Sequence, residues 1–373
     1  MFRGQFCAGN ARIVPRRIGC KDLKRGKQMG NPKISVIVPA YNEEKYLPVM
    51  LDCVMRQTLQ DFEIIIVNDG SSDATQSIID TYITRFPSKV FCISQENQGL
   101  SASRNNAMKI ASGEYAAFLD ADDLIADNYL ELLYSAAKKE DADIAKCSYI
   151  DFDNETGKTL CEIDAVKRTV EFETGYRYVF QYCAWAGIYR LAFLRRYEIL
   201  FSVGEQMEDS PFSLTAHPLA NRVAVVGDYL YSHRMHSGSI MANVKDAKKD
   251  PKIPYKGFES AIRNVRKYLT DPVRLEIADY CFVRVLSDYA TERYKTQGKE
   301  VRRKLCDYFK NIMNQYFPDI MENRYLFGDG KDRIASLPLF EREAVRLFSM
   351  SWKTKLIYPF SSVSSFALRV MNK

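Results

Sequence analysis

Between residues 33 and 147, short apolar segments alternate with segments of helical periodicity, and this alternation constrains the fold more than any other feature. The predicted strands are short apolar runs at 34–38, 62–67, 90–94, 115–119 and 144–147, of which the first two are rich in Val and Ile. The apolar spacing between them predicts helices at 43–57, 73–86, 100–111 and 127–138. Parallel strands need crossover connections of this length. The sequence therefore predicts an α/β fold with a Rossmann-like, mostly parallel sheet flanked by helices.

The pattern changes after about residue 150. We predict a hairpin region at 151–172, a helical segment at 176–196 and a strand at 222–231, followed by amphipathic helices from about residue 255. The chain then divides into a basic extension (1–32), a sheet domain (33–245) and a mainly helical C-terminal region (246–373).

The net charge of +6 is concentrated at the N-terminus. Residues 1–28 hold eight Lys or Arg and one Asp, a net +7, so the remaining residues together carry −1. A nearly neutral body gives no support for nucleic-acid binding, and we predict no nucleic-acid partner. We expect residues 1–28 either to be a disordered extension or to precede a true start at Met29.

The nine cysteines are scattered without a CxxC pair, which predicts neither a zinc site nor a disulfide framework. Reduced cysteines in apolar segments are typical of a reducing compartment. No apolar run reaches the roughly 18–20 residues of a membrane-spanning helix, and the N-terminus lacks the apolar core of a secretory signal. We therefore expect a cytoplasmic protein.

Acidic side chains follow several predicted strands, and the cluster Asp120-Ala-Asp122-Asp123 offers the most chemistry. Carboxylates this close repel one another unless a cation lies between them. Hard oxygen ligands favour Mg²⁺ or Mn²⁺, which can neutralise the charge on a leaving diphosphate. The alternative is a capping turn in which Asp122 or Asp123 starts the next helix.

Four motifs occur in order, each at the end of a predicted strand or the start of a predicted helix. They are Pro39-Ala-Tyr-Asn42, Asn68-Asp-Gly-Ser-Ser-Asp73, Gly99-Leu-Ser-Ala-Ser-Arg-Asn105 and Asp120-Ala-Asp-Asp123. In this arrangement, the segment from about residue 33 to 240 resembles the family 2 glycosyltransferases. The resemblance implies the GT-A fold and inverting transfer of a sugar from a nucleotide diphosphate donor with a divalent cation, Mn²⁺ or Mg²⁺.

The resemblance also implies roles for the motif residues. Asp69 would accept a hydrogen bond from the base, usually uracil, and Arg104 would lie near the base and phosphate. The alternative for Asp69 is a structural role in a turn, and the alternative for Arg104 is a surface ion pair on its helix. Asp120 would face the ribose, and Asp122 would be the main metal ligand. The nucleotide pocket would also be lined by Pro39, Tyr41 and Glu43.

An inverting transfer needs a base that takes the proton of the acceptor hydroxyl as it attacks the anomeric carbon. The family places an Asp for this role in a Glu-Asp pair, and here Glu208-Asp209 lies 87 residues after Asp122. We predict that Asp209 is the base, and that Glu208 either raises its pKa by repulsion or binds the acceptor. The alternative is an acidic first turn of a helix before Pro211.

The segment from Tyr231 to Ser239 resembles another loop of the family and holds two of the three histidines. Arg234 would clamp the diphosphate and His236 would complete the metal shell. For His233 the alternative is packing within the strand.

The segment Trp185-Ala-Gly-Ile-Tyr-Arg190 resembles a family segment that has lysine where this chain has Gly187. This departure puts a lysine contact from that position in question. Trp185 would either stack on a sugar face or pack in the core.

Residues 345–373 combine basic and aromatic side chains and contain no acid. This composition is typical of an interfacial helix on an anionic membrane, and the alternative is a helix packed on the rest of the protein. Peripheral contact with the inner face of the membrane would suit a lipid-linked acceptor.

The predicted function is transfer from a nucleotide-sugar, with a UDP-sugar as the expected donor, to a glycan or lipid-linked glycan during polysaccharide, capsule or glycoconjugate synthesis. One alternative is a nucleotidyltransferase, which usually carries a Gly-rich loop with Arg or Lys after the first strand. The other is an inactive nucleotide-sugar-binding scaffold, against which the intact Asp122 and Asp209 count.

Overall fold

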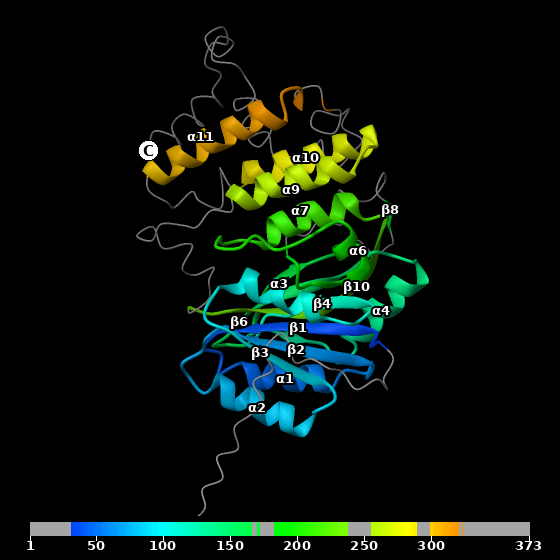
Figure 1. Cartoon of the computed structure of the whole chain (residues 1–373), viewed down its shortest axis with the longest axis vertical. Helices are drawn as coiled ribbons and strands as arrows, with labels where there is room; N and C mark the ends of the chain where they lie inside the picture. The colour runs from blue at the N-terminus through cyan, green and yellow to red at the C-terminus, as the bar shows by residue number, and fades with distance from the viewer. Residues whose placement is uncertain are drawn as a thin grey trace, which may run out of the picture.

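The computed structural model describes residues 31–165, 170–171, 183–237, 255–288, 299–320 and 323. Most of the predicted N-terminal extension, the predicted boundary at residue 245 and the basic aromatic segment at 345–373 lie outside these residues. The chain is an α/β protein whose strands form one sheet with helices on both faces (Figure 1).

The strands of the described residues form a sheet in the order β3-β2-β1-β4-β9-β6-β10-β5, with β7 beside β6 and β8 beside β10. Their bounds are β1 Ile34–Ala40, β2 Phe62–Asn68, β3 Val90–Ser94, β4 Tyr115–Phe118, β5 Leu124–Ile125, β6 Ile144–Asp153, β7 Thr159–Ile163, β8 Val170–Glu171, β9 Gly187–Arg190 and β10 Arg222–Met235. The pairs β3–β2, β2–β1 and β1–β4 are parallel, as is the pair β6–β10. Strand β9 is antiparallel to both β4 and β6.

The helices follow the strands as crossover connections in the first half of the chain and stack together in the second half. Their bounds are α1 Leu47–Met55, α2 Thr75–Arg85, α3 Leu100–Ile110, α4 Tyr129–Lys139, α6 Leu191–Arg196, α7 Asp209–Leu219, α9 Tyr255–Tyr268, α10 Pro272–Asp288 and α11 Lys299–Tyr316. None of these helices is long and apolar enough to cross a bilayer.

The alternation of side chains along the central strands creates two apolar cores. In β1, Val36 and Val38 face α1, α2 and α4, whereas Ile37 faces α3 and α7. Neighbouring strands repeat this division, because successive side chains of a strand point to opposite faces. Both faces are covered, which explains why β1 and β2 are buried along their whole length.

Strand β9 corrects the predicted helix at 176–196. Residues 187–190 form a strand that runs antiparallel between β4 and β6, and only 191–196 form a helix, α6. Residues 176–182 lie outside the described part. The apolar run Gly187-Ile-Tyr is buried between two strands, so tertiary pairing outweighs the helical periodicity of the surrounding residues.

Helices α9, α10 and α11 lie beyond α7, on the side of the molecule away from α1 and α2 (Figure 1). The carboxylate of Glu205, in the loop before α7, accepts hydrogen bonds from the N–H groups of Lys256 and Gly257 in the first turn of α9. These N–H groups have no partner within the helix, so an acidic side chain there satisfies them and favours the helix dipole. Glu205 therefore joins the loop before Asp209 to the helical region.

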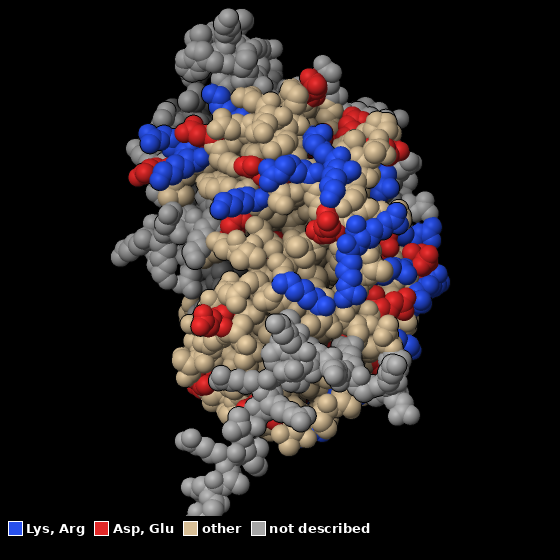
Figure 2. Space-filling view, in the orientation of Figure 1, with Lys and Arg blue, Asp and Glu red and all other residues tan. Residues whose placement is uncertain are grey.

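Figure 2 shows Lys and Arg side chains over the part of the molecule formed by the later helices, with acidic side chains among them. Helix α9 contributes cations that are paired with acids: Lys267 lies 2.6 Å from Glu198, Arg263 lies 3.2 Å from Glu259 and Arg266 lies 2.9 Å from Asp279. The described part of this face is therefore of mixed charge.

Gly113 permits the close approach of the turn before β4 to β1, and its replacement is expected to destabilise the fold. A Cβ at this position would lie 2.5 Å from the backbone nitrogen of Ser35. We expect Gly113→Ala to lower the free energy of unfolding by roughly 1–3 kcal/mol, measured by urea denaturation. Gly157→Ala is the control, because Gly157 has positive φ but open space, so only backbone strain of about 1 kcal/mol applies. A loss below about 1 kcal/mol in Gly113→Ala, or a larger loss in Gly157→Ala than in Gly113→Ala, would contradict this account.

Candidate active site

The acidic loop after β4 is fixed to β10 by Asp123. The Tyr231 hydroxyl donates to Asp123 Oδ2 at 2.5 Å, and the Arg234 N–H donates to Oδ1 at 2.7 Å. Asp123 is 1% exposed, and burial raises its pKa well above the usual value, with repulsion from Asp122 adding to the effect. Helix α4 begins later, at Tyr129, so neither Asp122 nor Asp123 caps it as the alternative required.

Asp122 and His236 lie together at the outer end of this loop. Asp122 Oδ2 is 2.9 Å from His236 Nε2, and the Arg234 side chain donates from Nε to the Asp122 carbonyl at 2.6 Å. The His236 ring packs 5.2 Å from Tyr46, over which the Arg234 guanidinium also lies. The longer course of β10, to Met235 instead of the predicted 231, brings these side chains to the loop.

The predicted metal pair is compatible with a cation shared with a substrate. The described residues contain no group of three or more His, Cys, Asp or Glu side chains arranged around one point. Mg²⁺ commonly binds through one or two carboxylates and completes its shell with phosphate oxygens and water, and Mn²⁺ also accepts imidazole. A carboxylate and an imidazole 2.9 Å apart therefore fit a metal held jointly with a diphosphate.

Arg104 is the centre of the site. Its side chain is fully buried in α3, and its Nη atoms contact Asp120 at 2.6 Å, Glu208 at 2.7 Å and Asp209 at 2.8 Å. The guanidinium also lies over the Phe201 ring. These contacts exclude the alternative of a surface ion pair. They direct the guanidinium to protein carboxylates, and a role next to the base and phosphate stays a prediction.

Glu208 and Asp209 stand at the start of α7, and Arg104 holds both. Burial raises the pKa of Glu208 to about 7; repulsion from Asp209 adds to the rise and Arg104 opposes it. Burial also raises the pKa of Asp209, against the attraction of Arg104. Asp209 Oδ2 accepts a further hydrogen bond from the Ala184 N–H at 3.2 Å. The Asp209 side chain is 19% exposed and that of Glu208 10%, so Asp209 is the more accessible of the two.

The loops after β1 and β2 are bound to each other. Asn42 Oδ1 accepts from the Ser72 N–H, and Asp73 Oδ2 accepts from the Glu44 N–H. The Glu43 N–H donates to the Thr75 hydroxyl at 2.8 Å. These contacts hold Glu43 beside the acidic loop after β4.

The Glu43 side chain lies close enough to the acidic loop after β4 to be repelled by its carboxylates. Burial raises its pKa to about 8, and repulsion from Asp122, Asp120 and Asp73 adds to this rise. The predicted neighbours of Glu43 differ in exposure: Pro39 is buried within β1, and Tyr41 is 51% exposed.

Asp69 lies buried after β2 and organises the segment before α3. Its Oδ1 accepts from the Gln95 side chain at 2.7 Å and the Gln98 N–H at 2.9 Å, and its Oδ2 accepts from the Gly99 N–H at 2.8 Å. A carboxylate offers about four lone-pair sites, so one remains on Oδ2. The remaining lone pair on Oδ2 could accept a hydrogen bond from a nucleotide base, and this role of Asp69 stays a prediction.

Trp185 packs in an aromatic cluster. It is 7% exposed, stacks on Tyr231 at 4.5 Å and on His233 at 5.1 Å, and meets the edge of Tyr149. Trp185 was expected either to stack on a sugar or to pack in the core, and the structure shows core packing. His233 Nδ1 lies 2.9 Å from Asp151, and this hydrogen bond helps to raise the His233 pKa to about 9 against the opposing effect of burial.

The predicted residues form two connected groups. Asp122 and His236 share one contact, Asp120 joins Glu208 and Asp209 through Arg104, and the Asp120–Asp122 loop links the groups. Asp69 lies farther along the same edge of the sheet, since β2 neighbours β1 and β1 neighbours β4.

The sequence did not predict the roles of two residues that lie next to the site. Tyr231 donates to Asp123, and Lys146 is a buried cation whose amine lies 2.8 Å from the Cys183 carbonyl oxygen. The signal for Lys146 was a lysine within the apolar strand segment at 144–147, where an exposed charge is not expected.

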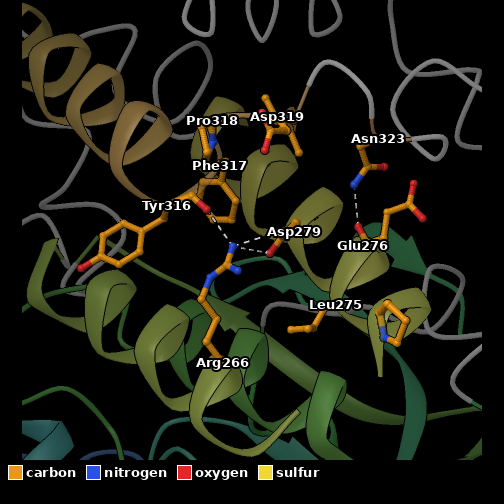
Figure 3. Close-up of a pocket in the computed structure, with 11 residues that line it drawn as sticks. Arg266, Leu275, Glu276, Asp279, Tyr316, Phe317, Pro318, Asp319 and Asn323 are labelled. Carbon is orange, nitrogen blue, oxygen red and sulfur yellow. Dashed lines mark hydrogen bonds and ion pairs between the residues drawn. The ribbon is translucent and has the colours of Figure 1, made fainter. Parts of the chain in front are cut away.

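A cavity of about 480 Å³ lies elsewhere, where the end of α11 meets α9 and α10 (Figure 3). Arg266 among its lining residues already contacts Asp279 and the Tyr316 carbonyl, and Asn323 donates to the Glu276 carbonyl. The cavity contains none of the predicted site residues.

Comparison with known proteins agrees with this arrangement. The model of the family described as Glycosyl transferase family 2 matches residues 35–193. Glycosyltransferase GlyG of Streptococcus pneumoniae is 32% identical over 220 residues, which make up 56% of this chain and 72% of GlyG. EpsH of Bacillus subtilis is 34% identical over 57% of this chain, which spans 64% of EpsH, less than two thirds of its length.

A solved structure shares the fold. The crystal structure of S. aureus TarS 1–349 in complex with UDP-GlcNAc superposes with a TM-score of 0.67 at 22% identity, and the match covers 88% of this chain and 94% of that chain. This similarity supports the GT-A architecture predicted for the α/β fold.

Removing the buried cation is expected to destabilise the protein strongly. Arg104→Met leaves three carboxylates facing one another, and breaking such a buried pair costs roughly 3–5 kcal/mol of unfolding free energy at pH 7. The deficit should shrink toward pH 5, because protonation removes the repulsion. Urea denaturation at both pH values measures this, with exposed Arg85→Met as the control. A loss below about 1 kcal/mol for Arg104→Met would contradict the assigned charges.

The His233–Asp151 pair predicts a pH-dependent stability. The pKa of His233 is about 9 in the folded chain against an ordinary 6.5, so its contribution is fully present below pH 6.5 and is lost as the pH rises through 9. Asp151→Asn should therefore be less stable than the wild type by roughly 1–2 kcal/mol at pH 6 and nearly equal to it above pH 9. Thermal unfolding from pH 6 to 10 measures the difference, and a constant gap would argue against the pair.

Proposed function

Since the chain belongs to glycosyltransferase family 2, we propose that it is an inverting, metal-dependent enzyme that transfers a sugar from a nucleotide diphosphate donor to a hydroxyl of a glycan. The proposed donor is a UDP-sugar, and the proposed acceptor is a glycan or lipid-linked glycan in polysaccharide or glycoconjugate synthesis. The proposed domain division keeps the transfer chemistry within residues 33–245.

The observation that carries this proposal is that Arg104 contacts a carboxylate on the proposed donor side, Asp120, and one on the proposed acceptor side, Asp209. Asp120 belongs to the loop proposed to hold the donor, and Asp209 is the proposed base for the acceptor. An inverting transfer needs the base and the leaving diphosphate on opposite sides of one anomeric carbon. A single buried guanidinium that holds both loops fixes the distance between them.

On the donor side, Asp69 is proposed to accept from the base through its remaining lone pair, and Asp120 to face the ribose. Arg234 is already oriented between the rings of Tyr46 and Phe152, which leaves a planar cation near the proposed diphosphate position. Asp122 and His236 would hold the cation, which when bound neutralises charge on the leaving diphosphate.

On the acceptor side, Asp209 is proposed to take the hydroxyl proton. Both of its oxygens already accept one hydrogen bond, from Arg104 and from the Ala184 N–H, and each keeps a further lone pair. Those two donors fix the carboxylate orientation before the acceptor arrives. The raised pKa of Asp209 makes it a stronger proton acceptor than an exposed carboxylate.

The UDP-sugar donor is supported by TarS, whose solved structure contains UDP-GlcNAc and which shares this fold. A thermal-shift screen of nucleotide-sugars with and without Mn²⁺ would identify the donor, because a ligand that binds the native state raises its stability.

The assignment of the base predicts a separation of binding from turnover. With the donor found in the screen, Asp209→Asn is expected to bind it with near wild-type affinity and to lose about 10²–10⁴-fold in kcat. Asp122→Asn should lose both turnover and metal-dependent donor binding, roughly tenfold or more. Nucleotide release and calorimetric titration measure the two effects.

Asp228→Asn is the matched control, because Asp228 is exposed on β10 and contacts none of the proposed site residues in the described structure. Near wild-type turnover in Asp209→Asn would refute the base. Donor binding and metal dependence without any transfer in the wild type would favour the inactive scaffold.

A further inference from the structure

Lys146 is a fully buried lysine in the interior of the sheet. It lies in β6, has no exposed surface, and is the cross-strand partner of Gly187 in β9. Its Nζ donates to the Cys183 carbonyl at 2.8 Å and lies 3.4 Å from the Tyr189 hydroxyl. A buried charge is costly unless its hydrogen bonds are made, so its retention at this position calls for an explanation.

The carbonyl that Lys146 contacts belongs to the peptide bond that contacts Asp209. The Cys183 C=O accepts from Lys146, and the N–H of the same peptide, that of Ala184, donates to Asp209 Oδ2 at 3.2 Å. A cation on the oxygen of a peptide polarises its N–H and strengthens the hydrogen bond which that N–H donates. One peptide group therefore connects the ammonium to the carboxylate.

Glycine at position 187 gives the lysine its space. Lys146 and Gly187 are cross-strand partners in β6 and β9. A Cβ at position 187 would lie 2.8 Å from Lys146 Cδ and 2.3 Å from the Ala145 carbonyl oxygen. The family segment has lysine at position 187, whereas this chain has glycine there and a lysine, Lys146, directly opposite on the neighbouring strand.

We propose that Lys146 is a positioning residue for Asp209, acting through the Cys183–Ala184 peptide to orient the carboxylate and to favour its charged form. This inference rests on the proposed role of Asp209 as the base. Lys146 itself does not touch the substrate. The groups that face Asp209 are Arg104 from α3, Asp120 from the loop after β4, Lys146 from β6, Cys183 from the segment before β9, Tyr189 from β9, and Glu208 beside it.

The electrostatic effects agree with this role. Burial raises the pKa of Asp209, whereas Arg104, the Ala184 N–H and Lys146 lower it. Burial lowers the pKa of Lys146, whereas Tyr189, Cys183 and Cys147 raise it, and the net direction is upward. An ammonium at this position lowers the pKa of Asp209, so loss of its charge would shift Asp209 toward its protonated form.

The test is the pH profile of Lys146→Met in the full chain. The assay uses the donor identified by screening, with Mn²⁺ present. The acid limb of the kcat/KM profile should move to a pH about one unit higher, so that kcat/KM is roughly tenfold lower than in the wild type at pH values below the wild-type midpoint. The KM for the donor should stay near the wild-type value. Lys158→Met, which removes an exposed lysine beyond the same strand, is the control and should leave the profile unchanged.

A second readout needs no activity. In ¹³C spectra of aspartate carboxyl groups, with the Asp209 signal identified from Asp209→Asn, the titration midpoint should rise in Lys146→Met. Lys146→Gln is the second variant if the first does not fold, because it keeps a donor for the Cys183 carbonyl. In the wild type, ¹⁵N spectra should show Lys146 as an ammonium at pH 7.

These readouts separate two failures. A wild type without transfer for any donor would refute the proposed function, while the Asp209 titration would still report on Lys146. Transfer with an unmoved acid limb and an unmoved Asp209 midpoint would overturn the role of Lys146. A neutral Lys146 amine at pH 7 would overturn it even if neither variant folds.

Discussion

The arrangement of this site depends on one buried guanidinium and three carboxylates. Arg104 carries a single positive charge, so it cannot balance Asp120, Glu208 and Asp209 if all three are ionised. Burial raises the pKa of Glu208 to about 7, and repulsion from Asp209 and Asp120 adds to the rise. Glu208 and Asp209 therefore titrate as a coupled pair, and a proton taken by one is felt by the other. Such a pair can accept a proton near neutral pH without leaving Arg104 unpaired.

The sheet brings these residues together because it combines parallel and antiparallel strands. The parallel strands β1, β2 and β4 end at one edge and place Glu43, Asp69 and Asp120 there. The antiparallel insertion of β9 between β4 and β6 places the Cys183–Ala184 peptide beside Asp209. Strand β10 then extends past the acidic loop and contributes Arg234 and the segment with His236.

The sequence was most informative where local patterns repeat. The strands up to residue 118 and their crossover helices lie close to the predicted positions, because period-two and helical spacings are local properties. The strand β9 could not be recognised, since its strand state depends on pairing with β4 and β6. The burial of Arg104 was equally hidden, because its partners lie 16 to 105 residues away in sequence. The roles carried over from the family resemblance remain proposals about chemistry.

Glu205 has a consequence for how this chain can be divided or recombined. One carboxylate in the loop leading to Asp209 satisfies two N–H groups in the first turn of α9. A chimera that exchanged the later helices for those of another protein would keep the loop in place only if its own helix began at the same point. The loop that leads to the proposed base and the start of α9 therefore have to be exchanged together.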